Sequence, residues 1–393
     1  RRSSDLALGF VMTVYIDVTE FLRHPVRTGI QRVCGELCRW WPGNDLIPVA
    51  LSASSRLVPL PSDTRSVISS YFQASSDKLP MVRESISQIA AASREIHDDV
   101  DICKSPIIVP EVFYDPKRIE FFQALLPEQY GNVHFIAFDT LPLTHPQYFP
   151  AKSPYELIEG YFRLVRKAKH VGFISRSTRE VFCQRLLRRP DFDGPVLRLG
   201  SDSMGERSPR PSNPGLKFSV LGTIEPRKRH ALILDAFERM FPEMPDLSLT
   251  FIGGMGWVDE ATATRIRTLS QSRPRQFTWI DRADDRVIRE TVSSSRATLY
   301  LSAAEGYGLP PVESLYLGVP VIATRNIPSL EEIHGGVWFV DPDPIDVRRA
   351  VVALCHDSTY ARLREECGQL PLPTWRSFSE QVREWCLQTQ KVR

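Results

Sequence analysis

The sequence predicts an α/β protein built from two doubly wound parallel sheets. Short β-branched runs alternate with amphipathic stretches of about 10 to 16 residues, which is typical of βαβ units. The alternation occurs twice, and 393 residues are too many for one ordinary core. Because open parallel sheets bind ligands at the carboxyl ends of their strands, we expect the functional site in a cleft between two such domains.

The first half of the chain is expected to contain six strands with helices between most of them. These strands are predicted at residues 10–17, 46–52, 106–112, 133–139, 170–176 and 195–201. Residues 54–104 fit the alternation poorly, because they are polar with scattered apolar positions, and we expect a helical or partly mobile insertion there.

A stretch rich in Ser, Pro and Gly, "SMGERSPRPSNPG" at 203–215, is expected to connect the two domains. It places the first domain at 1–207 and the second at 208–393. Strands of the second domain are predicted at 217–223, 247–254, 277–282, 297–303, 319–324 and 337–342. The amphipathic end of the chain, 378–393, has no strand after it, so we expect a helix that packs back across the domains.

The charge balance argues against nucleic acid as a partner. The chain has 49 basic and 47 acidic residues, which leaves no overall field strong enough to hold a polyanion. Residues 151–200 are an exception, with eleven Lys or Arg and five Asp or Glu, a surplus of six. This segment is either a solvated helix face or a contact with an anionic acceptor or a membrane surface.

The cysteines indicate a reducing compartment, and the hydropathy gives no sign of a membrane span. Seven cysteines occur without a C-x-x-C pair, and none of the spacings suggests a disulfide framework. No apolar run approaches the roughly 18 residues that a membrane span needs. We therefore expect a cytoplasmic protein, with the inner face of a membrane as the alternative location through residues 151–200.

The stretch "EGYGLPPVESLYLGVP", residues 305–320, follows the predicted strand 297–303. Pro310 or Pro311 marks the start of a short helix, and Gly318 is expected to end it. Gly306 and Gly308 carry no side chains where backbone N–H groups would face a ligand, and the helix N-terminus adds a partial positive charge. The pattern predicts an anion seat that suits a diphosphate.

Two carboxylates flank this seat. Glu305 precedes the helix and Glu313 is expected in its first turn, so the two side chains would reach opposite ends of a bound ligand. Carboxylates accept hydrogen bonds from hydroxyl groups, and a nucleotide-sugar has hydroxyl-bearing rings on both sides of its diphosphate. The alternative is that Glu313 complements the helix dipole and Glu305 caps a loop.

Three more loops are expected at the same edge of the second sheet. "GTIEPRK" places Arg227 and Lys228 after the first strand, where cations can neutralise a diphosphate, although a plain basic turn would look the same. "FIGGMGW" places Gly254 after the second strand, which is a weak signal by itself. "WIDRADD" places Arg282 after the third, as a candidate for recognising the base.

These segments resemble a known family. "SAAEGYGLPPVESLYLGVPVIAT" is similar to the E-x7-E signature of retaining glycosyltransferases of family 4, which have the GT-B fold of two Rossmann-like domains, and "GTIEPRK" is similar to their phosphate-binding segment. The resemblance covers nearly all of residues 215–345. It implies that Glu305 holds the hydroxyls of the donor sugar, Glu313 those of the ribose, and Lys228 the diphosphate. Thr223 stands where the family has an arginine, and Arg227 is its expected substitute.

Tyr307 and Leu309 belong to the same turn and are expected beside the donor.

The first half of the chain resembles the family more weakly, as expected for an acceptor-binding domain. "DVTEFLRHPVRTGIQRVCGELCRWW" is similar to the first strand, glycine loop and helix, with Gly29 opening the helix near the phosphates. "FDTLPLTHPQYF" is similar to the H-D-x-x-P segment, with Phe138 in place of the histidine and Asp139 as the polar candidate near the reacting carbon. His145 is either a substitute or a loop histidine without a catalytic role. Ser175 and Asp202 also fall in family-like segments near the hinge.

The resemblance implies a retaining hexosyltransferase that works by front-face substitution. No metal or other cofactor is expected, because the three Asp-x-Asp pairs, at 99–101, 191–193 and 341–343, do not coincide with the phosphate seat. The segments are most similar to bacterial polysaccharide mannosyl- and rhamnosyltransferases. GDP-mannose is therefore the first expected donor, with rhamnosyl or glucosyl donors as alternatives, and a growing glycan or a lipid-linked saccharide is the expected acceptor. A sugar-nucleotide epimerase and an inactive nucleotide-sugar-binding module are the competing function classes.

Overall fold

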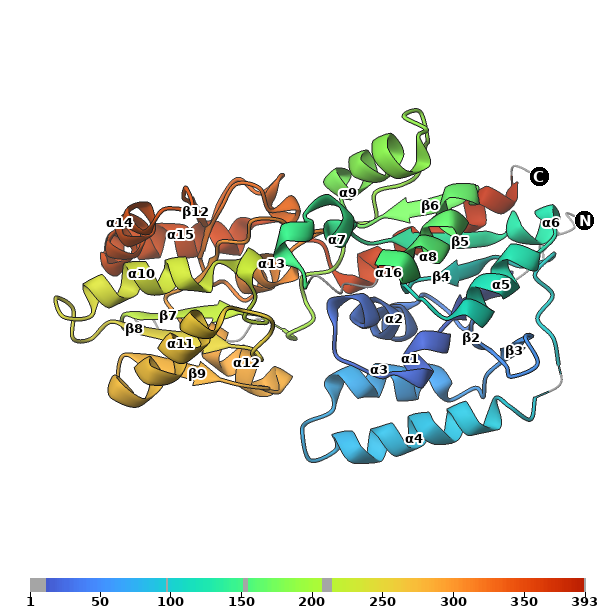
Figure 1. Cartoon of the computed structure of the whole chain (residues 1–393), viewed down its shortest axis with the longest axis horizontal. Helices are drawn as coiled ribbons and strands as arrows, with labels where there is room; N and C mark the ends of the chain where they lie inside the picture. Colours follow the sequence, from blue (N-terminus) through green and yellow to red (C-terminus); the bar gives the residue numbers. More distant parts are fainter. Residues whose placement is uncertain (1–11, 97, 151–154, 207–213, 392–393) are drawn as a thin grey trace, which may run out of the picture.

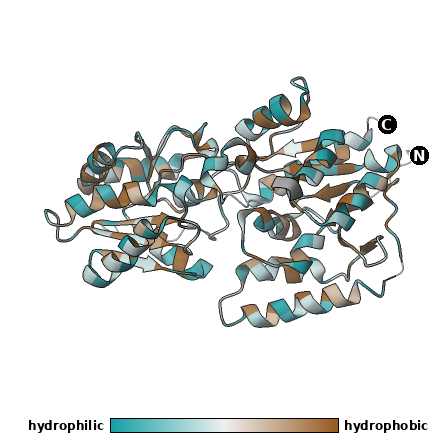
Figure 2. Cartoon of the chain, in the orientation of Figure 1, coloured by the Kyte–Doolittle hydropathy of each residue, from teal (hydrophilic) through white to brown (hydrophobic). Residues whose placement is uncertain are grey.

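The computed structural model describes residues 12–96, 98–150, 155–206 and 214–391. They form two α/β domains that lie side by side (Figure 1). Figure 2 shows apolar residues along the strands and on the inward sides of the helices, and polar residues on the outside. No helix in these ranges is long and apolar enough to cross a membrane.

The first domain contains a six-stranded sheet in the order β3-β2-β1-β4-β5-β6. The strands are β1 Val14–Asp17, β2 Leu46–Leu51, β3 Leu57–Pro59, β4 Ile107–Val109, β5 Val133–Ala137 and β6 His170–Phe173. Only β2 and β3 pair in antiparallel fashion, and the other neighbours are parallel. Helices therefore connect most strands, as parallel crossovers require.

The second domain has a six-stranded sheet in the order β12-β11-β10-β7-β8-β9, with all pairs parallel. The strands are β7 Lys217–Leu221, β8 Ser248–Ile252, β9 Phe277–Ile280, β10 Ala297–Tyr300, β11 Val321–Ala323 and β12 Val337–Phe339. Counted from the first strand of each domain, the two sheets have the same order, which is the Rossmann order 3-2-1-4-5-6.

Helices cover both sheets. In the first domain these are α1 Thr19–Arg23, α2 Gly29–Trp40, α3 Thr64–Gln73, α4 Leu79–Ala92, α5 Pro116–Ala124, α6 Pro127–Tyr130, α7 Leu141–Thr144, η1 Pro146–Tyr148, α8 Tyr155–Lys167, α9 Arg176–Val181 and the π-helix η2 Phe182–Leu187. After β7 come η3 Pro226–Lys228, α10 His230–Met240, α11 Glu260–Ser272, α12 Asp285–Ser293, α13 Leu309–Tyr316, η4 Pro328–Leu330, α14 Pro344–Cys355, α15 Asp357–Gln369 and α16 Trp375–Lys391.

Side-chain caps explain where several of these helices begin. The side chain of Thr28 accepts a hydrogen bond from a backbone N–H in the first turn of α2. Asp259, Asp284 and Asp343 do the same for α11, α12 and α14. Each cap satisfies a backbone donor that the helix itself leaves unpaired. The same residue types at these positions are the sequence signals for a helix start.

The segment 54–104 contains a strand as well as helices. Strand β3 turns back on β2 and extends the first sheet, and α3 and α4 follow it. Helix α3 buries Ile68, Tyr71 and Phe72, and it packs against α2. This segment is therefore part of the packed first domain. The expected domain boundary at 207/208 falls outside the described residues, as do the first two residues of the strand expected at 10–17.

The strand expected at 195–201 is not formed. Val196 forms a single bridge to Phe173, the last residue of β6. Because β6 ends there, the rest of the stretch finds no strand residues to pair with. Its apolar residues Leu197 and Leu199 are buried in the core instead. The apolar alternation of this stretch therefore reflects packing and does not indicate a strand.

Helix α16 returns from the second domain to the first. Its residues Trp375, Phe378 and Val382 are fully buried, and the helix lies against α2. Arg383 forms an ion pair of 2.6 Å with Asp45 at the start of β2. The end of the chain therefore ties the two domains together through apolar packing and a charged contact.

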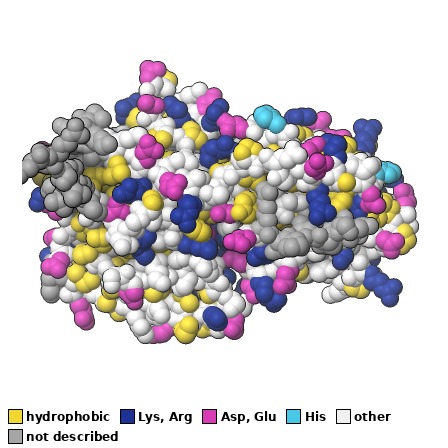
Figure 3. Space-filling model, turned by 180° about the vertical axis from the view of Figure 1, so that it is seen from behind, with side chains coloured by type: hydrophobic (Ala, Val, Ile, Leu, Met, Phe, Trp, Pro, Cys, Tyr) yellow, Lys and Arg dark blue, Asp and Glu magenta, His cyan; other side chains and the backbone are white. Residues whose placement is uncertain are grey.

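Several basic residues of the segment 151–200 form ion pairs. Arg163 pairs with Glu159, Arg179 with Asp193, and Arg198 with Glu332. On the face shown in Figure 3, side chains of both charges are interspersed over the molecule. These contacts favour a solvated helix face for the described part of this segment, and residues 151–154 lie outside the description.

Candidate active site

The loops at the centre of the second sheet are placed to bind a ligand. Strands β7 and β10 are neighbours, and the order of the sheet reverses between them. Residues 222–229 and 301–308 are the loops that follow these two strands. The two loops lead away from each other at the topological switch point, where doubly wound sheets bind ligands. Arg227, Lys228 and Glu305 all lie in these two loops.

Two helix N-termini face each other across the domain boundary. Gly308 precedes α13 with φ of 89°, a left-handed conformation that favours glycine. A side chain at Gly29, the first residue of α2, would come within 3.7 Å of Leu309, the first residue of α13. Figure 1 shows both helices on the facing sides of the two domains. Because each N-terminus carries a partial positive charge, the pair favours an anion beside them.

Arg227 is engaged by two carboxylates. Its guanidinium contacts Glu305 and lies 2.6 Å from Glu225, and it also donates a hydrogen bond of 3.1 Å to the carbonyl of Ala304. The Glu225 side chain is 4% exposed and that of Glu305 is 10% exposed, so solvent screens these contacts little. In this arrangement Arg227 fixes the position of Glu305.

Lys228 sits beside Gly222 at the end of β7. A side chain at Gly222 would collide with the ammonium of Lys228, so glycine makes room for it there. Burial lowers the pKa of Lys228, and the nearby Glu305 opposes this shift. Within the described residues the ammonium makes no hydrogen bond or ion pair, in contrast to the guanidinium of Arg227. Lys228 is therefore the cation that can turn to an incoming anion.

Asp139 joins the site from the first domain. A side chain at Gly306 would come within 2.7 Å of its Oδ2 atom, so the carboxylate lies directly against the backbone of the glycine turn. Its Oδ1 atom accepts a hydrogen bond of 3.1 Å from the backbone of Leu141. Burial raises the pKa of Asp139, and Arg227 opposes that shift.

A cavity of about 220 Å³ is lined by residues from both domains. Asp139 and His145 line it from the first domain, and Glu305, Gly306 and Asn326 line it from the second. The Thr144 hydroxyl is 2.9 Å from Nδ1 of His145. Asp139, His145 and Glu305, which the sequence places far apart, therefore share one cavity.

Glu313 lies deeper than the sequence suggests. It is the fifth residue of α13, which puts it just past the first turn where we expected it, and only 6% of it is exposed. It accepts a hydrogen bond from Ser203. Burial raises its pKa, and the guanidinium of Arg32 opposes the shift. Arg32 in turn lies 3.5 Å from Asp285.

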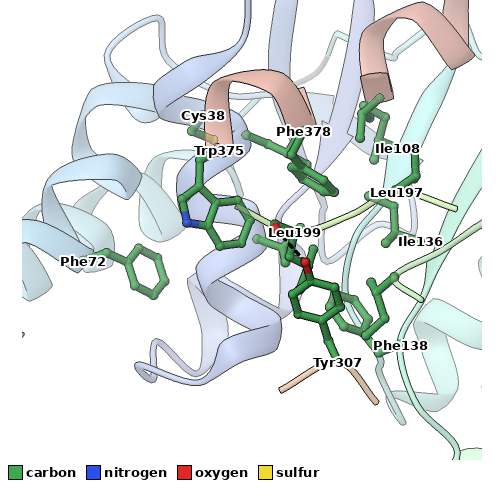
Figure 4. Close-up of a cluster of buried hydrophobic side chains, with 14 of the residues drawn as sticks. Cys38, Phe72, Ile108, Ile136, Phe138, Leu197, Leu199, Tyr307, Trp375 and Phe378 are labelled. Atoms are coloured by element: carbon green, nitrogen blue, oxygen red, sulfur yellow. Dashed lines mark hydrogen bonds between the residues drawn. The ribbon is translucent and has the colours of Figure 1, made fainter. Parts of the chain in front are cut away.

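Tyr307 and Leu309 point away from the cavity. Figure 4 shows the Tyr307 ring among Leu199, Trp375 and Phe378, and its hydroxyl donates a hydrogen bond of 2.9 Å to the carbonyl of Leu199. Leu309 packs against the same apolar cluster. The side chains of these two predicted donor contacts are thus parts of the interface between the domains. Asp202 is also structural, since it accepts a hydrogen bond of 2.7 Å from the backbone of Trp375.

The carbonyl of Gly306 is held from the first domain. The hydroxyls of Ser175 and Thr178 donate hydrogen bonds of 2.7 Å and 3.2 Å to it. These contacts fix the glycine turn against α9. Ser175 was singled out near the hinge, and Thr178 was not, although it lies one turn further along the same helix.

Thr223, Gly254 and Arg282 lie at the carboxyl ends of β7, β8 and β9, as expected. A side chain at Gly254 would come within 3.4 Å of Asp281, so these loops are adjacent. The side chain of Arg282 is 90% exposed and lies 3.8 Å from Asp281. Strand β9 is the edge of the sheet, and Arg282 is therefore the most peripheral of the predicted site residues.

Besides Thr178, four contributing residues were not predicted from the sequence. They are Arg32, Ser203, Glu225 and Asn326. Arg32 is one turn beyond Gly29 in α2, and Glu225 stands two residues before Arg227, so proximity to a predicted site residue was the available signal. Within the described residues no group of three or more His, Cys, Asp or Glu side chains is arranged to hold a metal ion.

Comparisons with known proteins agree with this architecture. Residues 207–369 match the family model described as Glycosyl transferases group 1. The serotype-specific mannosyltransferase WbdA of Escherichia coli is 33% identical over 168 residues, which are 42% of this chain and 20% of WbdA. The O-antigen chain mannosyltransferase B of Escherichia coli is 30% identical over 249 residues, which are 60% of this chain and 61% of that protein. The chain thus spans about a fifth of the length of the first curated relatives it matches.

Solved structures with the same fold cover nearly the whole chain. Anabaena Alr3699/HepE in complex with UDP and glucose superimposes with a TM-score of 0.63 at 12% identity, covering 95% of this chain and 98% of that one. Sucrose-phosphate synthase from Thermosynechococcus elongatus gives 0.55 at 16% identity, covering 81% of each chain. The chain therefore has the GT-B fold, and its residues 207–369 match the family model of group 1 glycosyl transferases.

Proposed function

We propose that this protein is a retaining, metal-independent hexosyltransferase. Its first expected donor is GDP-mannose, and its acceptor is a hydroxyl of a growing bacterial glycan or of a lipid-linked saccharide. The observation that carries the proposal is that Asp139 and Glu305 line one cavity, with Lys228 near enough to Glu305 to interact with its charge and the N-termini of α2 and α13 adjacent to each other. The mannosyltransferases among the relatives support mannose as the sugar.

The donor diphosphate is proposed to lie between the two helix N-termini. Backbone N–H groups and the Lys228 ammonium would hold its oxygens, and both stabilise the negative charge that grows on the leaving group. Glu305, held by Arg227, would accept hydrogen bonds from hydroxyls of the sugar. Glu313 would accept one from the ribose in exchange for Ser203.

The proposed reaction is a front-face substitution. The bond between the anomeric carbon and the leaving phosphate oxygen breaks, and the acceptor oxygen forms its bond on the same face. The acceptor proton passes to the leaving phosphate oxygen, so no side chain has to act as a nucleophile. The protein contributes orientation and charge stabilisation, and Asp139 lies where it can hydrogen-bond the reacting groups.

Turnover of the donor with and without acceptor tests this function. Purified protein and GDP-mannose should release nucleotide faster when a mannose-terminated oligosaccharide is present. Isomerisation of the sugar without acceptor would identify an epimerase, and binding without turnover would identify a binding module. A thermal-shift panel of nucleotide sugars identifies the donor, since a ligand that binds only the folded state raises the melting temperature. Loss of turnover in chelator, restored by manganese, would contradict metal independence.

A further inference from the structure

A second, larger hollow lies in the first domain, away from the candidate active site. It has a volume of about 730 Å³ and is enclosed by α1, the turn after β2, the end of α4 and the start of α5. Small side chains form much of its wall, namely Ala50, Ala53, Ser87, Ala90, Ala91 and Ser93. No described residue lines both this hollow and the cavity at Glu305. We call it the α1–α4 pocket.

The rim of the α1–α4 pocket is cationic. Arg23 from α1, Arg94 from the end of α4 and Lys117 from α5 line it, and of the described residues that line it none is Asp or Glu. Arg23 is paired with Asp115 outside the lining. Arg94 and Lys117 make no ion pair within the described ranges. Three cations from three elements therefore converge on one hollow, and two of them are uncompensated.

Among the described residues, the hollow between α10 and α14 is also lined by three cations without Asp or Glu, namely Arg239, Arg348 and Arg349, but Arg348 is paired with Glu243. The hollow beside α9 also has two arginines in its lining, Arg176 and Arg179, but it contains Glu180 as well. In the α1–α4 pocket, small side chains leave an open space in the wall, and the long cationic side chains lie around this space. Arginine and lysine bind phosphate oxygens through charge-assisted hydrogen bonds, so the pocket suits a phosphate group better than a neutral ligand.

The chain connects this pocket to the candidate active site. Arg23 and His24 line the pocket, and Gly29 opens α2 only five residues after His24. Five residues span at most about 18 Å even when fully extended. A ligand held at the pocket could therefore reach the start of α2 if it has the length of a short oligosaccharide, and the volume of the pocket exceeds the space that a phosphate alone would fill.

We propose that the α1–α4 pocket binds a phosphate or diphosphate group on the acceptor saccharide, remote from the hydroxyl that receives the sugar. The acceptor role rests on the proposed glycosyltransferase function. Anion binding at the pocket does not, and it can be measured without turnover. The two parts of the proposal are therefore tested separately.

Binding of inorganic pyrophosphate tests the site itself. Calorimetric titration of the wild type should show two classes of site, one lost in Lys228→Ala and the other in the double variant Arg94→Ala/Lys117→Ala. We expect the second class to weaken by about 100-fold, since each charge-assisted hydrogen bond contributes about tenfold or more. Arg83→Ala is the matched control, because Arg83 is an exposed residue of the same helix outside the pocket lining. Wild-type binding by the double variant would overturn the proposal.

Kinetics with a matched pair of acceptors tests the acceptor role. One mannose-terminated oligosaccharide carries a phosphate at its far end, and the other is the same saccharide without it. Wild type and Arg83→Ala should show a KM at least about tenfold lower for the phosphorylated acceptor, and the double variant should no longer distinguish the two. Equal KM values in the wild type would overturn the acceptor role. If neither acceptor is used while pyrophosphate still binds, the proposed function fails and anion binding at the pocket stands.

Discussion

The two domains have the same strand order but use the centre of the sheet in different ways. In the second domain, the loops after β7 and β10 carry Lys228 and Glu305, and Glu305 lines an open cavity. In the first domain, the corresponding strand β1 ends in Asp17 and β4 is followed by Glu111, and both side chains are buried. The same topological position thus forms a candidate ligand site in one domain and an internal charged cluster in the other.

The cluster in the first domain supports the segment that leads to the site. Arg118 donates hydrogen bonds of 3.0 Å and 2.7 Å to Asp17, and its guanidinium lies 3.9 Å from the ring centre of Phe113. The Gln31 side chain donates a hydrogen bond of 3.3 Å to Glu111 and one of 3.0 Å to the carbonyl of His24. The buried charges therefore position residues 24–29, which end at the N-terminus of α2. Four predictions separate this structural role from the binding role of the second domain.

The largest effect is expected from Arg118→Ala. It leaves the carboxylate of Asp17 buried without its cation, and breaking a buried pair costs about 3–5 kcal/mol. Urea unfolding should show this loss in the free energy of unfolding. Arg163→Ala, which breaks an exposed pair with Glu159, should cost less than about 1 kcal/mol. Equal effects of the two substitutions would mean that the cluster does not stabilise the first domain.

Lys228→Ala and Glu305→Ala should reduce transfer by about 100- to 1,000-fold each, because they remove charge stabilisation and orientation in the transition state. Both variants should keep the wild-type melting temperature within a few degrees. Lys217→Ala is the control, since Lys217 is an exposed lysine at the opposite end of β7. Near-normal turnover in both site variants would remove the assignment of the site.

The raised pKa of Glu111 predicts that the free energy of unfolding depends on pH. Burial raises its pKa from 4.5 to about 8, while Arg118 opposes the shift. Between these two values the native state holds a proton that the unfolded state has lost, so rising pH favours unfolding, by up to about 1.4 kcal/mol per pH unit. The contribution is fully present below pH 4.5 and is lost as pH rises through 8. Glu111→Gln should flatten this slope, and an unchanged slope would contradict the assignment.

The smallest effect is expected from Tyr307→Phe. It removes only the hydrogen bond to Leu199, which contributes about 1 kcal/mol, and leaves the ring in the apolar cluster. Thermal unfolding should therefore shift slightly while donor binding stays within a factor of about two. A large loss of donor affinity would mean that the Tyr307 hydroxyl contacts the nucleotide-sugar after all.

The sequence predicts local features of the second domain well. Strand 297–300, the glycine turn and the helix that begins after Gly308 are specified by neighbours in the chain, namely Pro310, Pro311 and the buried apolar run. The pairing of both sheets into two doubly wound layers also follows from local alternation. These elements could be predicted because each depends on residues within one or two turns.

Features that depend on distant contacts could not be predicted. The direction of Tyr307 is set by Leu199, the position of Glu305 by Arg227, and the burial of Asp17 by Arg118, and each partner lies at least 78 residues away. The α1–α4 pocket is formed by four segments of the first domain, so no single stretch of the sequence indicates it. Spacing along the chain indicates which groups share a sheet edge, but it does not indicate which of them are already paired.

The most direct test of the account is a crystal structure of the protein with GDP-mannose bound. The account predicts that the diphosphate lies against the backbone N–H groups at the start of α13, with Lys228 at hydrogen-bond distance, about 3 Å, from its oxygens. Glu305 should face the sugar. A donor bound elsewhere, with the space between α2 and α13 occupied only by solvent, would contradict it.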